Sequence, residues 1–159
     1  MENELYRRVR EAVREELCGA PGCHDFDHTE RVLRNARMLA RQELDPSDER
    51  AFLAVSLAAL LHDVARPEEL QSCGRICHAQ AGYGKSAVFL RRCGCVDEAL
   101  IGEVADAVRR HRYRGKDRPE TLIDRLVYDA DKLDSIGAVG VGRAFHFAGR
   151  IGAKLHNTS

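Results

Sequence analysis

Apolar side chains recur every three or four positions along most of this 159-residue chain, and this periodicity restricts its regular structure to helices. Leu5, Val9, Val13 and Leu17 form one such stripe near the N-terminus. No segment shows the alternation of apolar and polar residues that a half-buried strand requires. We therefore predict an all-α fold, a compact bundle of about six to seven helices in which residues 1–159 form one domain.

Glycines, prolines and capping residues predict where the helices begin and end. Asp27 and Glu30 have capping-box spacing, which predicts a helix start with Asp27 as N-cap. The remaining helices are expected over about 3–17, from 45–50 to Pro67, from His78 to about 92, over about 98–112, and from about Pro119 to 131. Glycines at 137, 140 and 142 predict a kink or break before a last helical segment, "RAFHFAGRI".

The charge balance excludes several classes of partner. The 25 Lys and Arg residues equal the 25 Asp and Glu residues, so no overall positive field favours nucleic acid or anionic lipid. The N-terminal segment "MENELYRRVREAV" is too charged for a signal peptide, and no apolar run reaches the ~18 residues of a membrane span. These features predict a cytoplasmic protein with no nucleic-acid or membrane partner.

Six cysteines stand at positions 18, 23, 73, 77, 93 and 95. Their spacings differ from the paired C-x2-C of zinc ribbons, and a cytosolic setting keeps most thiols reduced. Free thiols are the favoured interpretation, and disulfides or a thiolate metal site remain alternatives.

Three expected helices each bring a metal-ligand type of residue onto or beside an apolar face. These residues are His28, the adjacent pair His62 and Asp63, and Asp131. Burying an isolated carboxylate without a compensating charge costs on the order of several kcal/mol in lost solvation. A divalent metal ion bound by these groups removes that cost. Two imidazoles and two carboxylates leave open positions on a five- or six-coordinate ion, which favours catalysis and favours Mn, Fe, Co, Ni or Zn over Mg.

Three separated segments also carry a family resemblance. "HDFDHTERV", "AALLHDVA" and "DADKLDSIGAVGVGRAF" resemble, in order, the motifs of the HD superfamily of metal-dependent phosphohydrolases, in particular its small stand-alone hydrolases, and they lie within residues 24–147. The resemblance implies that His28, His62, Asp63 and Asp131 bind the metal. It also implies hydrolysis of a phosphate ester or anhydride, with a nucleotide as the expected small-molecule substrate. Taken singly, each residue has an ordinary structural alternative, such as a helix cap or a salt bridge.

Two further histidines, His78 and His111, lie between the HD pair and Asp131, where dinuclear HD proteins use additional histidines. They are candidates for a second metal or a phosphate contact, and the alternative is a core histidine bonded to a carbonyl. The other histidines, His24, His146 and His156, have no comparable context and are interpreted as surface or packing residues.

Cations and carboxylates near these motifs are the candidates for the catalytic set. A metal ion lowers the pKa of bound water and polarises a phosphoryl oxygen, which are the requirements for attack at phosphorus. Asp63 belongs to this catalytic set as well as to the ligands. Arg31 and Lys132 are the family-matched candidates for phosphate binding, and Asp134 is expected to orient a ligand or relay a proton.

The general acid is less well indicated. Some family members place a carboxylate shortly after the HD pair, where this chain has Arg66 and Pro67, so Glu68 is only a substitute candidate. Lys85 and Arg112 are additional cations for which a surface role is favoured.

Two other functions remain open at this level. A dinuclear-iron HD-type oxygenase would use His78 and His111 as ligands, and a non-catalytic, metal-stabilised binding module would use the metal only for stability. One ion with phosphate release favours the hydrolase, whereas two irons with oxygen consumption favour the oxygenase. The chain ends soon after the late motif, so we expect it to be short, clipped or completed by a partner, with a homo-oligomer as one option.

Overall fold

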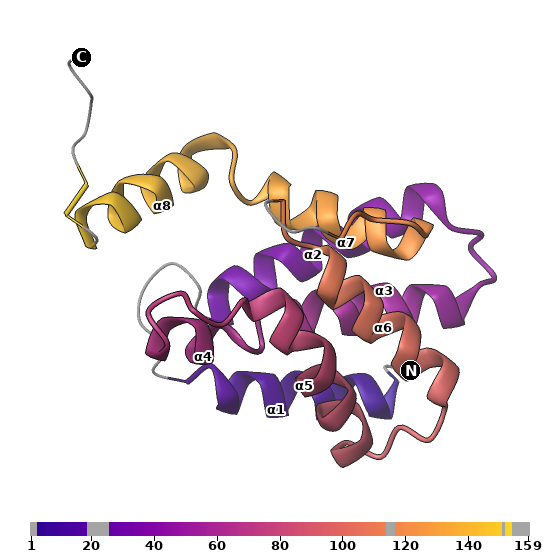
Figure 1. Cartoon of the computed structure of the whole chain (residues 1–159). Coiled ribbons are helices and arrows are strands. Elements are labelled where there is room, and N and C mark those ends of the chain that lie inside the picture. The colour runs from indigo at the N-terminus through magenta and orange to yellow at the C-terminus, as the bar shows by residue number, and fades with distance from the viewer. Residues whose placement is uncertain (1–2, 19–25, 114–116, 151, 154–159) are drawn as a thin grey trace.

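The computed structural model describes residues 3–18, 26–113, 117–150 and 152–153, and all regular structure in these ranges is helical. The helices are α1 (Glu4–Glu16), α2 (Phe26–Glu43), α3 (Glu49–Leu61), α4 (Arg66–Gln71), α5 (His78–Arg92), α6 (Glu98–Arg110), α7 (Leu122–Leu133) and α8 (Gly137–Arg150) (Figure 1). The all-α prediction is confirmed, and the short α4 is the helix that the sequence pattern did not predict.

Helix α3 forms the centre of the bundle. Every residue from Ala54 to Leu61 is buried, and α3 contacts α1, α2, α6 and α7. A helix that is apolar on all sides is stable only when other helices surround it. The residues that follow its last turn are therefore held by the packing of four neighbouring helices.

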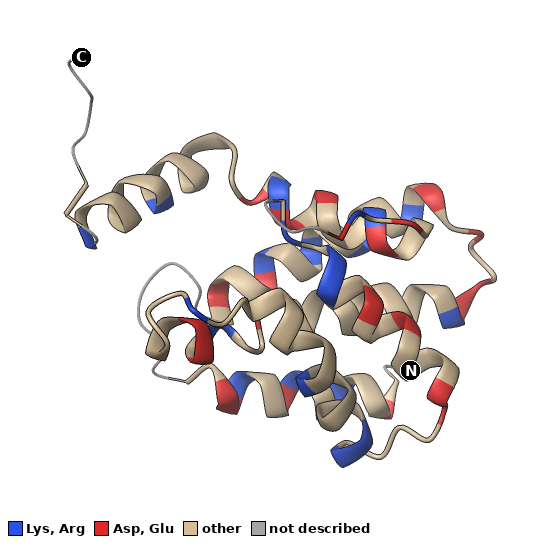
Figure 2. Cartoon of the chain, in the orientation of Figure 1, with Lys and Arg blue, Asp and Glu red and all other residues tan. Residues whose placement is uncertain are grey.

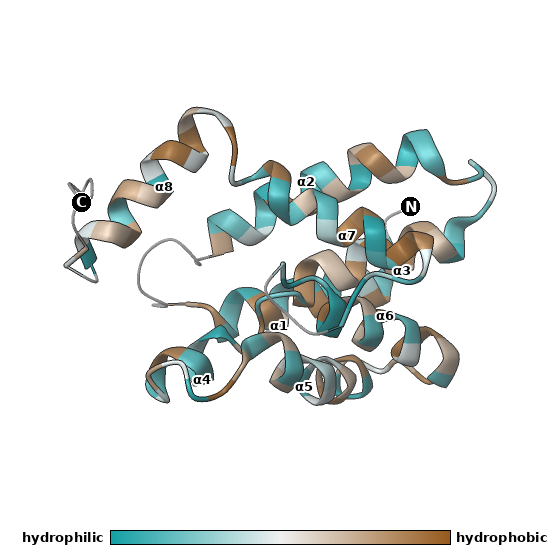
Figure 3. Ribbon diagram, turned by 45° about the horizontal axis from the view of Figure 1, so that its top comes forward, coloured by the Kyte–Doolittle hydropathy of each residue, from teal (hydrophilic) through white to brown (hydrophobic). Residues whose placement is uncertain are grey.

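The surrounding helices are amphipathic, with one apolar stripe each. In α1 this stripe consists of Tyr6, Val9 and Val13, and Asn3 caps the helix by accepting hydrogen bonds from its first turn. Hydrophilic and apolar residues interleave along α2 and α5 in Figure 3, as this arrangement requires. Helix α8 extends away from the bundle (Figure 1) and exposes His146, in agreement with its interpretation as a surface residue.

The predicted end of the central helix was wrong by several residues. Helix α3 ends at Leu61, with His62 as its C-cap, and Asp63 lies in a turn closed by a hydrogen bond from Arg66 N to Asp63 O (2.9 Å). Pro67 does not terminate α3 but lies in the first turn of α4, where its missing N–H has no helical partner to lose. The HD pair thus stands at a helix end rather than inside a helix.

Other predicted boundaries also needed correction. Asp27 is not an N-cap, because α2 already begins at Phe26 and Asp27 lies in its first turn. Helix α7 begins at Leu122 rather than near Pro119, since Thr121 forms a capping box with Asp124.

The glycines near residue 137 do not all act as helix breakers. Gly137 has φ +71°, a left-handed conformation, and makes the break between α7 and α8. The two other glycines, at 140 and 142, lie inside α8.

The described cysteines, Cys18, Cys73, Cys77, Cys93 and Cys95, are free thiols, as favoured from the sequence. Cys23, His24 and His156 lie outside the described residues. Of the helices described, none is long and apolar enough to cross a membrane.

The contact between α5 and α6 allows a paired test of packing. A Cβ at Gly82 would lie 2.8 Å from Val108 Cγ1, whereas a Cβ at Gly84 would meet nothing within 4 Å. Gly82→Ala should therefore lower the free energy of unfolding by about 1 to 3 kcal/mol. Gly84→Ala, the matched control in the same helix, should leave it unchanged or raise it by up to about 1 kcal/mol. Urea denaturation measures both, and equal effects of the two variants would contradict this packing.

Candidate metal centre

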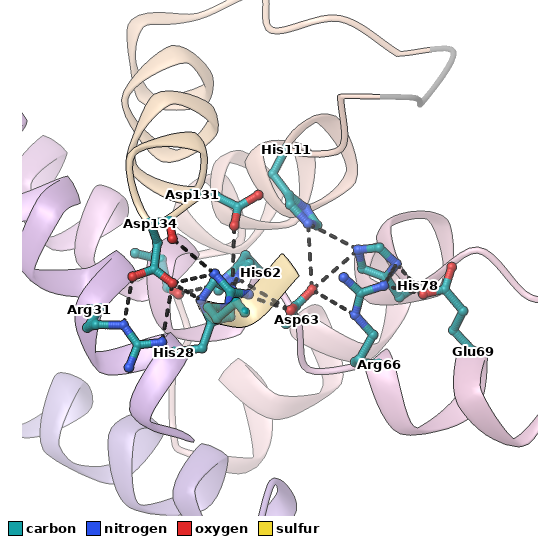
Figure 4. A network of polar contacts seen from close by, with 12 residues as sticks. His28, Arg31, His62, Asp63, Arg66, Glu69, His78, His111, Asp131 and Asp134 are labelled. Carbon is teal, nitrogen blue, oxygen red and sulfur yellow. Dashed lines mark hydrogen bonds and ion pairs between the residues drawn. The ribbon is translucent and has the colours of Figure 1, made fainter. Parts of the chain in front are cut away.

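The end of α3 places His62 and Asp63 in the interior, with exposures of 0% and 2%. His28 reaches the same point from the first turns of α2, and Asp131 reaches it from α7 (Figure 4). Helix α2 packs on both α3 and α7, so the three elements that carry these residues contact one another directly. The structure brings His28, His62 and Asp63 together, and Asp131 lies beside His28.

The first group of candidate ligands surrounds His28 Nε2. This atom lies 3.2 Å from His62 Nε2, 3.7 Å from Asp63 Oδ2 and 3.5 Å from Asp131 Oδ1. Three of these residues, His28, His62 and Asp63, offer ligand atoms that all lie within 4.8 Å of one another. Such a group of imidazole nitrogens and a carboxylate oxygen could hold a metal ion.

A second group uses the other oxygen of the same carboxylate. Asp63 Oδ1 lies 3.3 Å from His78 Nε2 and 3.8 Å from His111 Nε2, and the two Nε2 atoms are 3.2 Å apart. His78 begins α5, and His111 is the C-cap of α6. Figure 4 shows Asp63 between the two pairs of imidazoles, so one carboxylate serves both groups.

The hydrogen bonds of the four imidazoles decide which nitrogen faces these points. Each Nδ1 lies beside an acceptor: His28 at 2.7 Å from Asp134 Oδ2, His62 at 2.8 Å from Ala59 O, His78 at 2.8 Å from Glu69 Oε2, and His111 at 2.6 Å from Val108 O. An Nδ1 that donates carries the proton of a neutral ring, so Nε2 presents a lone pair. Arg66 Nη1 also lies near the Nδ1 of His78, at 3.1 Å, but the Glu69 carboxylate is closer.

Facing lone pairs provide a test of whether this site fits a metal ion. In each group two unprotonated Nε2 atoms lie 3.2 Å apart beside an oxygen of Asp63, an arrangement that is repulsive without a cation. Metal-binding histidines commonly donate their other N–H to a carboxylate or carbonyl, as all four do here. The residues therefore fit a divalent transition metal at either group.

The electrostatic environment keeps these groups in their ligand forms. Burial lowers the pKa of His28, lowers that of His78 to about 4, and lowers that of His111 to about 3. Burial alone would raise the pKa of Asp131, but the neighbouring imidazoles of His62 and His111 and the ammonium of Lys132 together hold it below its usual range. At neutral pH the three histidines are uncharged and Asp131 is ionised.

A cavity of about 230 Å³ opens beside the second group. Its lining contains three cations, Arg66, Arg112 and Lys132. The other lining residues are His78, His111, Tyr113 and Asp131. Lys132 Nζ lies 2.5 Å from Asp131 Oδ2, and Arg112 donates to Glu69 Oε1 (3.0 Å). The cavity is therefore suited to an anion that approaches the candidate metal ligands.

The other predicted residues take different places. Arg31 Nε donates to Asp134 Oδ1 (2.7 Å), which places Arg31 behind His28. Glu68 and Lys85 pair with each other, and neither lines this cavity.

Arg66 is one of the residues that sequence reasoning missed, as it missed Glu69 beside His78 and Tyr113 on the cavity lining. The Arg66 guanidinium lies 3.5 Å from Asp63 Oδ1 and contacts Glu69. Its position three residues after Asp63 was the available signal, because a turn brings residues at that spacing together.

Comparison with known proteins agrees with the fold and the motifs. The family model described as "HD domain" matches residues 25–136, and the chain belongs to this family. The matched range includes all four predicted metal ligands, His28, His62, Asp63 and Asp131.

Several relatives are similar over most of the chain. A predicted HD superfamily hydrolase from an uncultured Thermotogales bacterium has a solved structure with 34% identity and a TM-score of 0.71, covering 89% of this chain and 74% of that protein. YpgQ of Bacillus subtilis, described as uncharacterized, is 29% identical over 94% of this chain and 69% of its own length. Its structure in complex with ADP has a TM-score of 0.64 at 30% identity, over 97% of this chain and 70% of that one. The similarity to the Thermotogales protein supports a hydrolase.

The buried neutral histidines predict a pH dependence of stability in the metal-free protein. Between pH 6.5 and their lowered pKa values, about 4 and about 3, His78 and His111 are protonated in the unfolded chain but not in the fold. Unfolding then takes up protons, so the free energy of unfolding should fall as pH falls through this window, by about 1 kcal/mol per pH unit for each histidine. Urea denaturation in chelator from pH 7.5 to 4.5 measures the slope. His146→Gln, at an exposed site, should leave it unchanged, and a stability that is constant over this range would contradict the arrangement.

The contact between Asp134 and His28 predicts a positioning role. In Asp134→Asn the carboxylate that accepts from His28 Nδ1 and from Arg31 is lost, so His28 should be less well oriented. Metal affinity should fall about 10- to 100-fold. Competition against a metal-sensitive dye measures this change. The matched control is Asp129→Asn, an exposed position in the same helix, which should retain wild-type affinity. Equal affinities in both variants would show that Asp134 does not support the site.

Proposed function

We propose that this protein is a cytoplasmic, metal-dependent phosphohydrolase that cleaves a phosphate ester or anhydride bond of a nucleotide. The observation that carries the proposal is the arrangement of two histidine pairs around one buried carboxylate, Asp63, beside a cavity that contains three cations. The first feature fits metal binding, and the second fits a phosphate substrate.

The ligands in this proposal are His28, His62, Asp63 and Asp131 for one ion, and Asp63, His78 and His111 for a second. A transition metal such as Mn, Fe, Co, Ni or Zn suits the imidazoles better than Mg. A bound ion would supply an activated water and a Lewis acid for the phosphoryl oxygen.

The chain's own residues account for binding and orientation. Arg112 and Lys132, with Arg66, place positive charge around the cavity and would hold the phosphate groups. Asp134 holds the ring of His28, and Arg31 in turn holds Asp134, so Arg31 supports a ligand in this arrangement. The sequence-based role of Arg31 as a direct phosphate contact stays a prediction.

A nucleotide is favoured over other phosphate compounds by two observations. The related YpgQ has been crystallised with ADP. Tyr113, which is 66% exposed, lies on the lining of the cavity, where its ring is available to stack on a base. The phosphate cavity and the aromatic ring together match the two parts of a nucleotide.

An HD-type oxygenase with two irons is the second candidate. The observation in its favour is the second ligand group, Asp63 with His78 and His111, which such a site would require. The number of bound ions alone does not distinguish the two functions, because the proposed phosphohydrolase also uses both ligand groups, which share Asp63. The cationic cavity favours the phosphohydrolase, and oxygen consumption by the iron-loaded protein would favour the oxygenase. A non-catalytic binding module would show neither activity.

The test is hydrolysis of a panel of nucleoside mono-, di- and triphosphates by protein loaded with each candidate metal. We expect metal-dependent product release and a melting temperature that rises with metal, by mass action on the folded state. In Asp63→Asn, metal binding and activity should both be lost while helix content remains. Arg112→Ala and Lys132→Ala should retain metal and lower kcat/KM about tenfold or more, as expected when a charged hydrogen bond of about 1.5 kcal/mol or more is lost.

Arg125→Ala is the control for the cation variants, because Arg125 is exposed on α7 and does not line the cavity. It should behave as wild type. Full activity in Asp63→Asn, together with a wild-type melt that is indifferent to chelator, would show that the HD pair is a structural element and that the proposal is wrong.

A further inference from the structure

Two adjoining cavities lie along α2, and the larger one is at the end of this helix remote from the metal centre. One has a volume of about 510 Å³ and is formed by α1, the end of α2 and the beginning of α3. The other, of about 360 Å³, lies between α1 and α2. The connection from α2 to α3 lies at the end of the bundle remote from α4 and α8 in both Figure 1 and Figure 3. The two cavities share Tyr6, Arg37 and Arg41, so they form one continuous hollow.

The smaller cavity is strongly basic. Four of its seven lining residues are arginines, Arg10, Arg34, Arg37 and Arg41, and one is a carboxylate, Glu30. Glu30 is already paired with Arg10 at 2.8 Å. Among the residues that the structure describes, no carboxylate forms an ion pair with any of the three other arginines. Their positive charge therefore remains available to an anion, although the chain as a whole is neutral. Figure 2 shows how Lys and Arg are distributed along α1 and α2.

Arg37 is held in place between the two cavities. Its guanidinium lies 4.3 Å from the centre of the Tyr6 ring and 5.9 Å from that of Phe52, and its Nε donates to Ser56 Oγ (3.2 Å). These contacts orient the guanidinium before any ligand arrives, which lowers the entropic cost of binding.

The larger cavity has a different chemistry. Its apolar lining consists of Ala40, Leu44, Pro46, Phe52 and Leu53, and polar acceptors stand at Asp45, Asp48 and Glu49. An apolar hollow with a few acceptors suits a purine or pyrimidine ring with its amino group and ribose hydroxyls. The volume lies within the range of roughly 300 to 1,000 Å³ that is typical of small-molecule sites.

We propose that this hollow is a second nucleotide site, which binds a nucleoside di- or triphosphate without hydrolysing it. The base would occupy the larger cavity, and the phosphates would bind Arg34, Arg37 and Arg41 in the smaller one. His28 precedes Arg37 by nine residues on α2, about 14 Å along the axis, so this ligand is separate from any substrate at the metal centre. Both sites use α2 and α3. Helix α2 carries His28 as well as the arginines, and α3 carries Ser56 and has His62 as its C-cap.

The experiment uses the full chain in chelator, so that binding does not depend on the metal centre or on the proposed hydrolysis. Isothermal titration with ADP and with inorganic pyrophosphate should each show one saturable site. The double variant Arg34→Ala, Arg41→Ala alters only exposed side chains and should weaken both ligands at least about tenfold. Phe52→Leu should weaken ADP several-fold and weaken pyrophosphate less, because only the nucleotide has a base.

One single variant serves as the control. Arg125→Ala removes the same charge from an exposed position of α7 and should bind ADP as wild type does. Arg112→Ala removes a cation from the cavity beside the metal centre, and it distinguishes ADP bound there from ADP bound at the second site. Three results would overturn the proposal. These are no saturable binding of either ligand, ADP binding that is lost in Arg112→Ala but not in the double variant, and equal ADP affinity in Phe52→Leu and wild type. Loss of hydrolysis in the metal-loaded protein would bear on the metal centre alone.

Discussion

A carboxylate buried among four imidazoles is the constraint on which the rest of the structure depends. Asp63 is almost fully enclosed, and each of its oxygens lies within 4 Å of two histidine Nε2 atoms. Such a charge is stable in an apolar interior only when donors or cations surround it, since otherwise the lost hydration is not replaced. The four rings face Asp63 with Nε2 lone pairs, so a metal ion held among them would supply the compensating charge. The bundle delivers the ends of α3, α5 and α6 and the first turns of α2 to this one point.

The imidazoles converge because most of them stand at the ends of helices. His62 and His111 are C-caps and His78 begins its helix, so three of the four imidazoles stand where a helix starts or stops. At a C-terminal end, the last carbonyls remain available as acceptors, and His62 and His111 bond to carbonyls three residues earlier. The local backbone thus orients the rings without additional side chains. The apolar packing of α3 against four helices supplies the rigidity.

A layer of charged residues completes the centre. Asp134 and Glu69 accept from the imidazoles on opposite sides, and arginines bind each of these carboxylates in turn. On the Glu69 side, Arg66 and Arg112 also line the cavity next to His111, so this part of the network both orients a ligand and supplies charge for an anion. Membership of the HD domain family agrees with this combination, and similarity to solved HD hydrolases extends over most of the chain.

The sequence by itself determined the helical class, the helices that carry the ligands and four residues that meet, because apolar periodicity and motif order are local properties. Helix ends were harder to predict. Pro67 lies in the first turn of α4, which begins at Arg66, instead of ending α3, since proline is compatible with both positions. Only the tertiary structure decided that Asp63 faces His78 and His111 as well as His28, that Arg31 contacts Asp134, and that Arg66 joins the centre. Each of these contacts depends on side-chain direction and on the packing of helices distant in sequence, and no spacing along a single helix specifies them.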